Sequence, residues 1–171
     1  LTAGDPSVIV AVVDQGVDYT HPDLVPNMWV NEAEKNGKPG VDDDGNGYVD
    51  DVHGYNFVDG EGDINYDKSQ DFDTGHGTHC AGIIGAVNNN GIGMAGVAGG
   101  TGNNDGVRIM SCQIFSKGYG GETRYSSRAI KYAADNGASV ISCSYGYPGG
   151  TFMSDGEFLR EDGAEAAAVR Y

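Results

Sequence analysis

Three short apolar runs, rich in β-branched residues, constrain the fold of this chain more than any other feature. They span residues 7–14 (SVIVAVVD), 107–115 (VRIMSCQIF) and 138–146 (ASVISCSYG). Continuous apolar runs of this length predict strands that are buried on both faces, as in parallel sheets. We therefore expect a parallel sheet at the centre of the molecule.

Two segments between these runs have the pattern of helices. Residues 76–87 (HGTHCAGIIGAV) place small and apolar residues at helical spacing, and the NNNGIG that follows is a stop signal. In residues 125–137 we expect Ser126 or Ser127 as the N-cap and Gly137 as the C-terminal stop. Strands that alternate with helices over short links predict an α/β fold.

The chemistry of an open parallel sheet gathers at one edge, because ligands bind beyond the carboxyl ends of its strands. Asp14 ends the first run, residues 116–121 follow the second, and residues 144–146 end the third. We expect all three segments to lie along one rim of the sheet.

The balance of charges excludes two classes of partner. The 171 residues include 25 acidic and 10 basic side chains, a formal net charge of −15. Such a surface repels nucleic acids and anionic membranes, so we expect no nucleic-acid partner. No run approaches the roughly 20 apolar residues of a membrane-spanning helix, so we expect no membrane insertion.

Many of the acidic residues fall in an Asp- and Gly-rich stretch at about 31–73. We interpret it as an ordered insertion within one domain of residues 1–171, because its residues 48–58 supply aromatic side chains that can pack. Residues 41–51 (VDDDGNGYVDD) resemble an EF-hand calcium loop, although His53 replaces the glutamate of the twelfth position. We predict a structural calcium ion whose ligands are Asp42, Asp44, Asn46, the Tyr48 carbonyl and Asp50.

Three cysteines, Cys80, Cys112 and Cys143, all lie inside apolar stretches. An odd number cannot pair completely within the chain. We expect free thiols that are buried as small apolar side chains.

The segment FDTGHGTHCAG (72–82) holds two histidines three residues apart. An imidazole held by a carboxylate can remove the proton of a nucleophilic serine. Alternatively, His76 and His79 could share one helix face and bind zinc as in a metal-dependent hydrolase, with further ligands from Asp14, His21 and Asp23.

Four motifs together resemble the subtilisin-like serine proteases in content, order and context. They are VAVVDQGVDYTHPDL, GHGTHCAG, NNNGIGMAGVA and VISCSYG, and the resemblance runs from about residue 8 to residue 146. It implies a subtilisin-like parallel β-sheet with helices on both faces, and a serine endopeptidase activity. His76 would be the general base, Asp14 would orient it, and His79 would have a structural role.

The resemblance also implies a substrate site for an extended polypeptide. Two backbone edges would hold the peptide by β-augmentation. They are Gly118, Tyr119 and Gly120 on one side, and Ser144, Tyr145 and Gly146 on the other. Tyr145 stands where the family usually has leucine, so we expect it to reshape a pocket beside the cleaved bond.

A second calcium site is implied by the resemblance alone. It would use the Asp23 carboxylate with residues of the 87–94 loop, namely Val87, Asn89, Ile92 and Met94, although this loop has one extra residue, Gly91. The resemblance and the supply of calcium also lead us to expect secretion or residence in a cell envelope.

The sequence departs from the family pattern in two respects. Gln15 stands where the family commonly has serine or threonine, and no GTS motif with its nucleophilic serine, nor the oxyanion-hole asparagine, occurs in the 171 residues. We therefore expect the chain to be the N-terminal part of a peptidase domain, inactive alone. The Ser-bearing half would be a covalent continuation or a separate chain. The alternative is a non-catalytic peptide-binding module of the same fold.

Overall fold

The structure is a computed structural model that describes residues 3–64, 75–116, 119–120, 122–146, 154, 156, 160 and 163–171. The strands are β1 (Ile9–Asp14), β2 (Gly54–Asn56), β3 (Arg108–Gln113), β4 (Phe115–Ser116), β5 (Tyr119–Gly120) and β6 (Ala138–Cys143). The helices are α1 (Glu32–Lys35), α2 (His76–Gly85), α3 (Thr123–Asp135) and α5 (Gly163–Val169), with a 3-10 turn η1 (Val25–Asn27). The three apolar runs form strands and both helical segments form helices, as predicted.

The main sheet has the strand order β2-β3-β1-β6, and each neighbouring pair is parallel. β1 is therefore an inner strand, paired on both sides. In the register, Asp14 lies opposite Gln113 of β3, and Val13 lies opposite Cys143 of β6. The carboxyl ends of three adjacent strands thus reach the same rim, with Asp14 in the middle.

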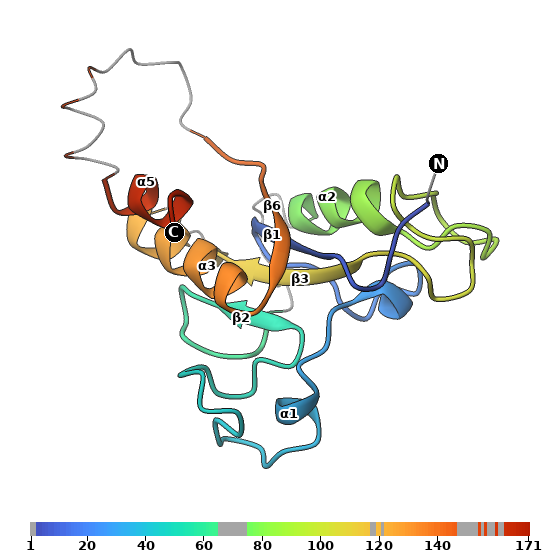
Figure 1. Ribbon diagram of the computed structural model, residues 1–171, viewed down its shortest axis with the longest axis horizontal. Helices are drawn as coiled ribbons and strands as arrows, with labels where there is room; N and C mark the ends of the chain where they lie inside the picture. Colours follow the sequence, from blue (N-terminus) through green and yellow to red (C-terminus); the bar gives the residue numbers. More distant parts are fainter. Residues whose placement is uncertain are drawn as a thin grey trace.

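Alternating side chains of β1 pack against different helices. Ala11 and Val13 lie in one apolar cluster with Ala129 and Tyr132 of α3, whereas Val12 lies in a second cluster with Ala81 of α2. Because successive residues of a strand point to opposite faces, α2 and α3 cover opposite faces of the sheet (Figure 1). The expected α/β fold with helices on both faces is confirmed.

Strand β6 is less buried than its sequence predicts. Val140 is 52% exposed and Cys143 is also exposed, so burial on both faces is wrong for this strand. Val140 lies opposite Val10, on the side of the sheet where α2 packs. Because α2 packs on β1 and β3, Val140 of β6 is left uncovered. The expectation of buried thiols is likewise right for Cys112 and wrong for Cys143, while Cys80 is partly exposed.

Helix α3 begins earlier than expected and stops where expected. Glu122 is its N-cap, and Ser126 is buried inside the helix with its hydroxyl donating to the Thr123 carbonyl. Neither Ser126 nor Ser127 caps the helix. Gly137 follows the C-cap with a φ of +83°, a conformation that suits glycine, so the predicted stop is confirmed.

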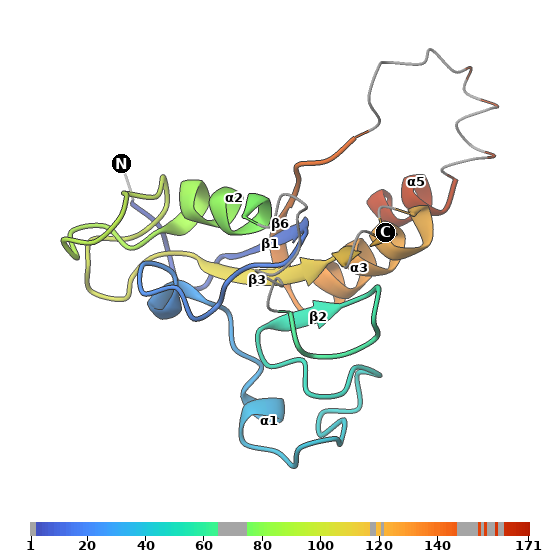
Figure 2. The same cartoon turned by 180° about the vertical axis from the view of Figure 1, so that it is seen from behind.

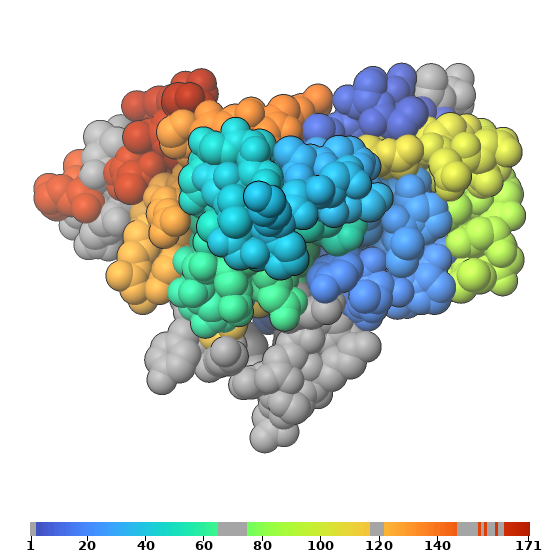
Figure 3. Space-filling model, turned by 90° about the horizontal axis from the view of Figure 1, so that it is seen from below, coloured from blue at the N-terminus to red at the C-terminus, as the bar shows by residue number. Residues whose placement is uncertain are grey.

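The Asp- and Gly-rich stretch is ordered over its described part, residues 31–64, and it contributes β2 to the main sheet. β2 approaches β3 so closely that a Cβ on Gly54 would lie 1.8 Å from the Ser111 carbonyl oxygen. The rest of the stretch forms a lobe around α1 below the sheet, seen from behind in Figure 2 and from below in Figure 3. Residues 65–73 of the predicted insertion lie outside the described residues.

Candidate active site

Asp14 is the last residue of β1, and its side chain is almost fully buried, with 1% of the residue exposed. Its Oδ1 accepts the backbone N–H of Gln15 at 2.7 Å, and its carbonyl accepts the N–H of Ile114 at 2.8 Å. Gln15 thus supplies a backbone donor to Asp14. The carboxylate is held in one place at the rim.

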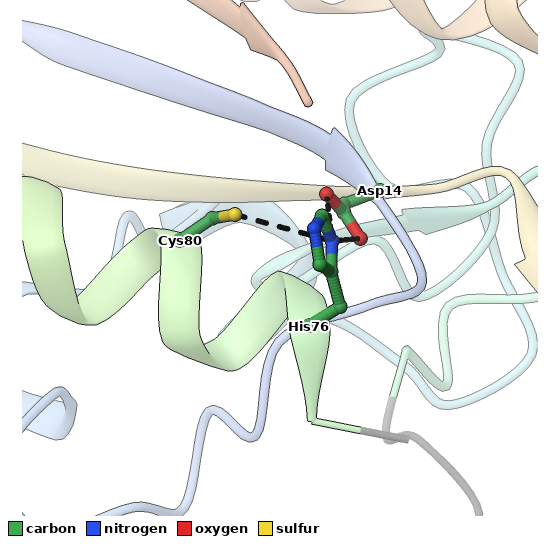
Figure 4. Close-up of side chains that lie close together, drawn as sticks. All are labelled: Asp14, His76 and Cys80. Atoms are coloured by element: carbon green, nitrogen blue, oxygen red, sulfur yellow. Dashed lines mark hydrogen bonds and ion pairs between the residues drawn. The ribbon is translucent and has the colours of Figure 1, made fainter. Parts of the chain in front are cut away.

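His76 is the first residue of α2 and faces this carboxylate (Figure 4). Its Nδ1 lies 2.8 Å from Asp14 Oδ1 and 2.9 Å from Oδ2. The imidazole is 39% exposed, whereas the carboxylate is 2% exposed. A buried carboxylate that accepts from Nδ1 fixes the tautomer in which Nε2 presents its lone pair.

A glycine lets α2 come close enough to β1 for this bond. A Cβ on Gly77 would lie 2.3 Å from the Gly16 carbonyl oxygen and 3.2 Å from Asp14 Cβ. The same contact is supported by the Thr78 hydroxyl, which accepts the backbone N–H of Asp18 at 2.9 Å. The HGTH motif therefore has a packing role as well as a chemical one.

The second histidine of the motif does not join the first. His79 is exposed, and its backbone N–H donates to Gly75 within the first turn. Among the described residues, the group of possible metal ligands around His76 contains Asp14 and Cys80, but not His79, His21 or Asp23. The ligand set predicted for the zinc alternative is not assembled.

The two expected substrate edges flank Asp14. On one side, β5 (Tyr119–Gly120) pairs antiparallel with β4, directly after β3; Gly118 lies outside the described residues. On the other side, Ser144, Tyr145 and Gly146 follow β6, and both Ser144 and Gly146 are exposed.

Tyr145 is held by two contacts. Its ring packs edge-on against Phe115, with centroids 6.1 Å apart, and its hydroxyl donates to Glu165 of α5 at 2.7 Å. Burial raises the pKa of the Tyr145 phenol, and the bond to Glu165 raises it further. The side chain thus joins one expected substrate edge to the strand that precedes the other.

Comparison with known proteins agrees with this geometry. The model described as "Subtilase family" matches residues 5–170. The chain belongs to the subtilase family. It is 41% identical over 138 residues to subtilisin-like protease 1 of Plasmodium vivax, and 35% identical over 145 residues to the halolysin-like extracellular serine protease Nep of Natrialba magadii.

A solved lanthipeptide protease is similar to this subtilase chain in structure as well, with a TM-score of 0.61 at 26% identity over 99% of the chain. The matched regions are 81% and 85% of the chain for the two relatives above. They are 20% and 22% of those relatives' own lengths, and 37% of the solved chain. The subtilase chain thus corresponds to a minor part of each of these proteins.

In the acidic lobe of this subtilase, the loop at 41–51 forms a compact turn. Asp42 accepts the backbone N–H groups of Gly45, Asn46 and Gly47 at 2.7–3.1 Å, and these bonds, first that from Gly47, lower the pKa of its carboxyl. The Asp50 carboxylate does not join the other acidic side chains of the loop, and it accepts the backbone N–H of Gly40. Tyr48 packs its ring among Tyr55, Phe57 and Tyr132.

Three carboxylates meet here, two from this loop and one from α1, and two of the three were not predicted as ligands. Glu34, Asp44 and Asp51 each place an oxygen within 4.8 Å of the others. Asp51 is fully buried, and burial raises the pKa of its carboxyl. Asp51 is one residue after Asp50, the ninth position of the EF-hand pattern, and Glu34 belongs to α1. The spacing of ligands in the loop therefore could not identify either residue.

The second expected calcium site has an equally specific arrangement. Asp23 is buried, and its two oxygens accept from the Asn90 amide at 2.7 Å and the Met94 N–H at 2.9 Å. The Val87 N–H donates to the Asp23 carbonyl at 2.9 Å. The prediction of Asn89 beside Asp23 is therefore wrong, because Asn90 occupies that place. The Asn89 amide donates to the Thr101 carbonyl instead. Ile92 is exposed in the same loop, and its N–H donates to Asn90.

Proposed function

We propose that this chain is part of a serine endopeptidase in which Asp14 and His76 act on a serine supplied from outside the 171 residues. The observation that carries the proposal is the bond from His76 Nδ1 to a buried carboxylate, 2.8 Å long, at the carboxyl end of an inner strand. The reaction class is supported by the names of two relatives, a thermophilic serine proteinase of Bacillus sp. and the halolysin-like extracellular serine protease Nep.

The chemistry follows from the two side chains. With its proton on Nδ1, His76 accepts the serine proton at Nε2 as the hydroxyl attacks the peptide carbonyl. The imidazolium that forms is stabilised by the Asp14 carboxylate, which is buried where water screens little. His76 then returns the proton to the leaving amine.

The substrate of this reaction would be an extended polypeptide that lies between the two edges beside Asp14. One edge is the β4–β5 pair, and the other is residues 144–146. Backbone groups on both sides would bind the peptide main chain, and such a site would accept many sequences.

We infer that the Ser-bearing part adds to the sheet next to β6. β6 is the outermost strand on its side of the described sheet, and it leaves Val140 52% exposed. An exposed apolar edge strand is a ready site for a further strand. This applies equally to a covalent continuation and to a partner chain.

The test is to supply the Ser-bearing sequence, fused after Tyr171 or as a separate chain. A fluorophosphonate should then label a serine in the added part, and the 171-residue chain alone should stay unlabelled. A non-catalytic binding module would bind peptide but would give no labelling in either form. Labelling of the 171-residue chain by itself would contradict the division of the triad.

We also propose that calcium stabilises the acidic lobe. The ion pairs of the described residues join Lys35 to Glu32, His76 to Asp14, Arg124 to Glu122 and Lys131 to Asp135, so none neutralises Glu34, Asp44 or Asp51. Three carboxylates within 4.8 Å repel one another unless a cation or protons neutralise them. Carboxylate oxygens, with the carbonyl and amide oxygens of the 41–51 loop, are the donors that calcium prefers.

A second calcium ion at Asp23 and the 87–94 loop, and an extracellular or cell-envelope location, complete the proposal. The location is supported by the Natrialba magadii relative, which is named as an extracellular protease. No helix in the described part of the chain combines the length and the apolar character that a membrane crossing requires.

A further inference from the structure

A pocket of about 510 Å³ lies between the loop that follows β1 and the segment that follows β2. Its lining includes Tyr19, Asp50, His53, Glu61, Gly62 and Asp63. The pocket shares no residue with the catalytic pair or with the three clustered carboxylates of the acidic lobe. It is therefore a separate feature of the molecule.

Backbone contacts fix the walls of this pocket. Glu61 pairs with Asn56 of β2, whose N–H donates to the Glu61 carbonyl at 2.9 Å. A Cβ on Gly62 would lie 2.0 Å from the Asp50 carbonyl oxygen, so a residue without a side chain lets the two segments meet there. The pocket is thus built into the fold.

One part of the lining is a pair of stacked rings. The centroids of Tyr19 and His53 lie 5.0 Å apart, with 30° between the ring planes. His53 Nδ1 lies 2.8 Å from the Trp29 carbonyl oxygen, and because a carbonyl only accepts, Nδ1 is the donor. In the neutral ring Nε2 is then an acceptor. The lining therefore combines aromatic surface with an acceptor nitrogen.

The other part of the lining is acidic. Asp50, Glu61 and Asp63 contribute three carboxylates. The ion pairs within the described part of the chain include neither Asp50 nor Glu61. No group of possible metal ligands among the described residues contains any of the three, so their oxygens do not converge on one small ion. The carboxylates suit a cation of larger extent.

A guanidinium group fits this combination better than an ammonium group does. It is planar, it stacks on aromatic rings, and its five N–H donors spread over a wider area than the three of an ammonium. The formal net charge of −15 also favours the approach of a basic polypeptide. Shape and charge therefore both point to arginine.

We propose that this pocket binds an arginine side chain of the polypeptide substrate. Asp63 precedes Ile64, whose carbonyl oxygen would lie 2.6 Å from a Cβ on Gly16. Gly16 is two residues after Asp14. Because an extended peptide advances roughly 3.3 Å per residue, a few residues reach from the catalytic pair to the pocket. The selection of substrates rests on the proposed function, whereas the binding of arginine needs only the described residues.

The first test is to titrate the 171-residue chain with Nα-acetyl-argininamide and follow the His53 ring by NMR. The double variant Glu61→Gln with Asp63→Asn should raise the dissociation constant by about 3- to 20-fold, the combined effect of two exposed ion pairs. The matched control, Glu32→Gln with Asp135→Asn, removes the same charge outside the pocket. It should change the constant by less than about 1.5-fold at physiological salt.

Matched ligands and ring variants test the guanidinium assignment. The citrulline derivative, a neutral ligand of the same shape, should bind at least about 5-fold more weakly, and the lysine derivative should also bind more weakly. Tyr19→Leu should weaken arginine binding by about 2- to 5-fold, whereas Tyr19→Phe should not. Circular dichroism of each variant establishes that it is folded. Equal binding of arginine and citrulline, equal effects of the two double variants, or equal binding of arginine and lysine would overturn the proposal.

The second test uses the complete protease and peptides with arginine at one position at a time. At one position, the Glu61→Gln and Asp63→Asn double variant should raise KM by about 3- to 20-fold with kcat unchanged, because a remote contact is made equally in the ground and transition states. Absence of activity would refute the proposed function and leave the binding result standing. Activity without any such position would refute substrate selection by the pocket.

Discussion

Tyr132 of α3 donates its hydroxyl to the buried carboxylate of Asp51, 2.6 Å away and 81 residues apart in the chain. This bond joins the acidic lobe to the core, because Tyr132 also lies in the apolar cluster with β1 and β3. Asp51 is in turn bonded by the amides of Asn31 and Asn46. Through Tyr132, the acidic lobe is thus hydrogen-bonded to the core that packs on the sheet containing Asp14.

Tyr132→Phe should destabilise the chain by about 1.5–3 kcal/mol, the usual contribution of a hydrogen bond to a charged group. The aromatic contacts with Tyr48 and Phe57 remain, so the loss isolates the hydroxyl. Urea unfolding measures it. Tyr125→Phe is the control, because within the described part of the chain that hydroxyl bonds only to the exposed Arg124 side chain. This change should alter the free energy of unfolding by less than about 0.5 kcal/mol.

Chelation of calcium should lower the melting temperature and expose the lobe to proteolysis. A ligand at 100 times its dissociation constant stabilises the native state by about 2.7 kcal/mol. Glu34→Gln and Asp44→Asn should weaken the calcium dependence, while Asp135→Asn, a surface change that breaks the pair with Lys131, should not. Identical melting curves in chelator and in calcium would contradict the proposal that the lobe binds calcium.

Two further variants decide between ligand sets. Asp50→Asn should weaken the calcium dependence if the EF-hand spacing determines the site, because Asp50 is the ninth position of that loop. Asp51→Asn should do so if the clustered carboxylates determine it. The geometry favours Asp51, since Asp50 bonds to Gly40 instead.

Gly77→Ala should weaken the contact between α2 and β1. The added methyl would meet the Gly16 carbonyl at 2.3 Å, and such overpacking commonly costs about 1–3 kcal/mol. Gly82→Ala is the matched control on the same helix, because its Cβ would meet only Met94 Sδ at 3.4 Å. Urea unfolding should show a loss for Gly77→Ala and a neutral or favourable change for Gly82→Ala.

Tyr145→Leu should change which substrates the complete protease prefers. The ring lies between Phe115 and Glu165, so its removal opens space beside one substrate edge. A changed pocket commonly shifts preference by about 1–3 kcal/mol per methylene-sized difference. Peptide-library profiles of the wild type, Tyr145→Leu and Tyr145→Phe decide it. Identical profiles in all three would remove Tyr145 from substrate selection.

The sequence predicts the central sheet, its two covering helices and the position of Asp14 because these depend on local patterns. Apolar runs define β1 and β3, and the HGTH motif begins α2 at His76. Exposure of Val140 in β6 could not be predicted, since it depends on how far α2 extends across the sheet. The true first residue of α3 was also missed, because Ser126 looks like a cap but is buried against Thr123.

Side-chain partners across the fold were harder to predict. Glu34 and Asp51 meet Asp44 from different elements, and Asn90 rather than Asn89 turns towards Asp23. Asn89 has a φ of +60°, and its amide donates to the Thr101 carbonyl instead. The position of Cys80 beside His76 could have been predicted from their i, i+4 spacing, which places both side chains on one side of a helix.

The central claim is that Asp14 and His76 act as one catalytic unit. The most direct test is to measure kcat for peptide hydrolysis by the complete protease, by Asp14→Ala, by His76→Ala and by the double variant. Each single change should lower kcat by about 10⁴-fold or more, the size of loss that the triad of subtilisin shows, and the double variant should be no slower than the worse single one. Losses that multiply in the double variant, or a His76→Ala enzyme near the wild-type rate, would contradict the account.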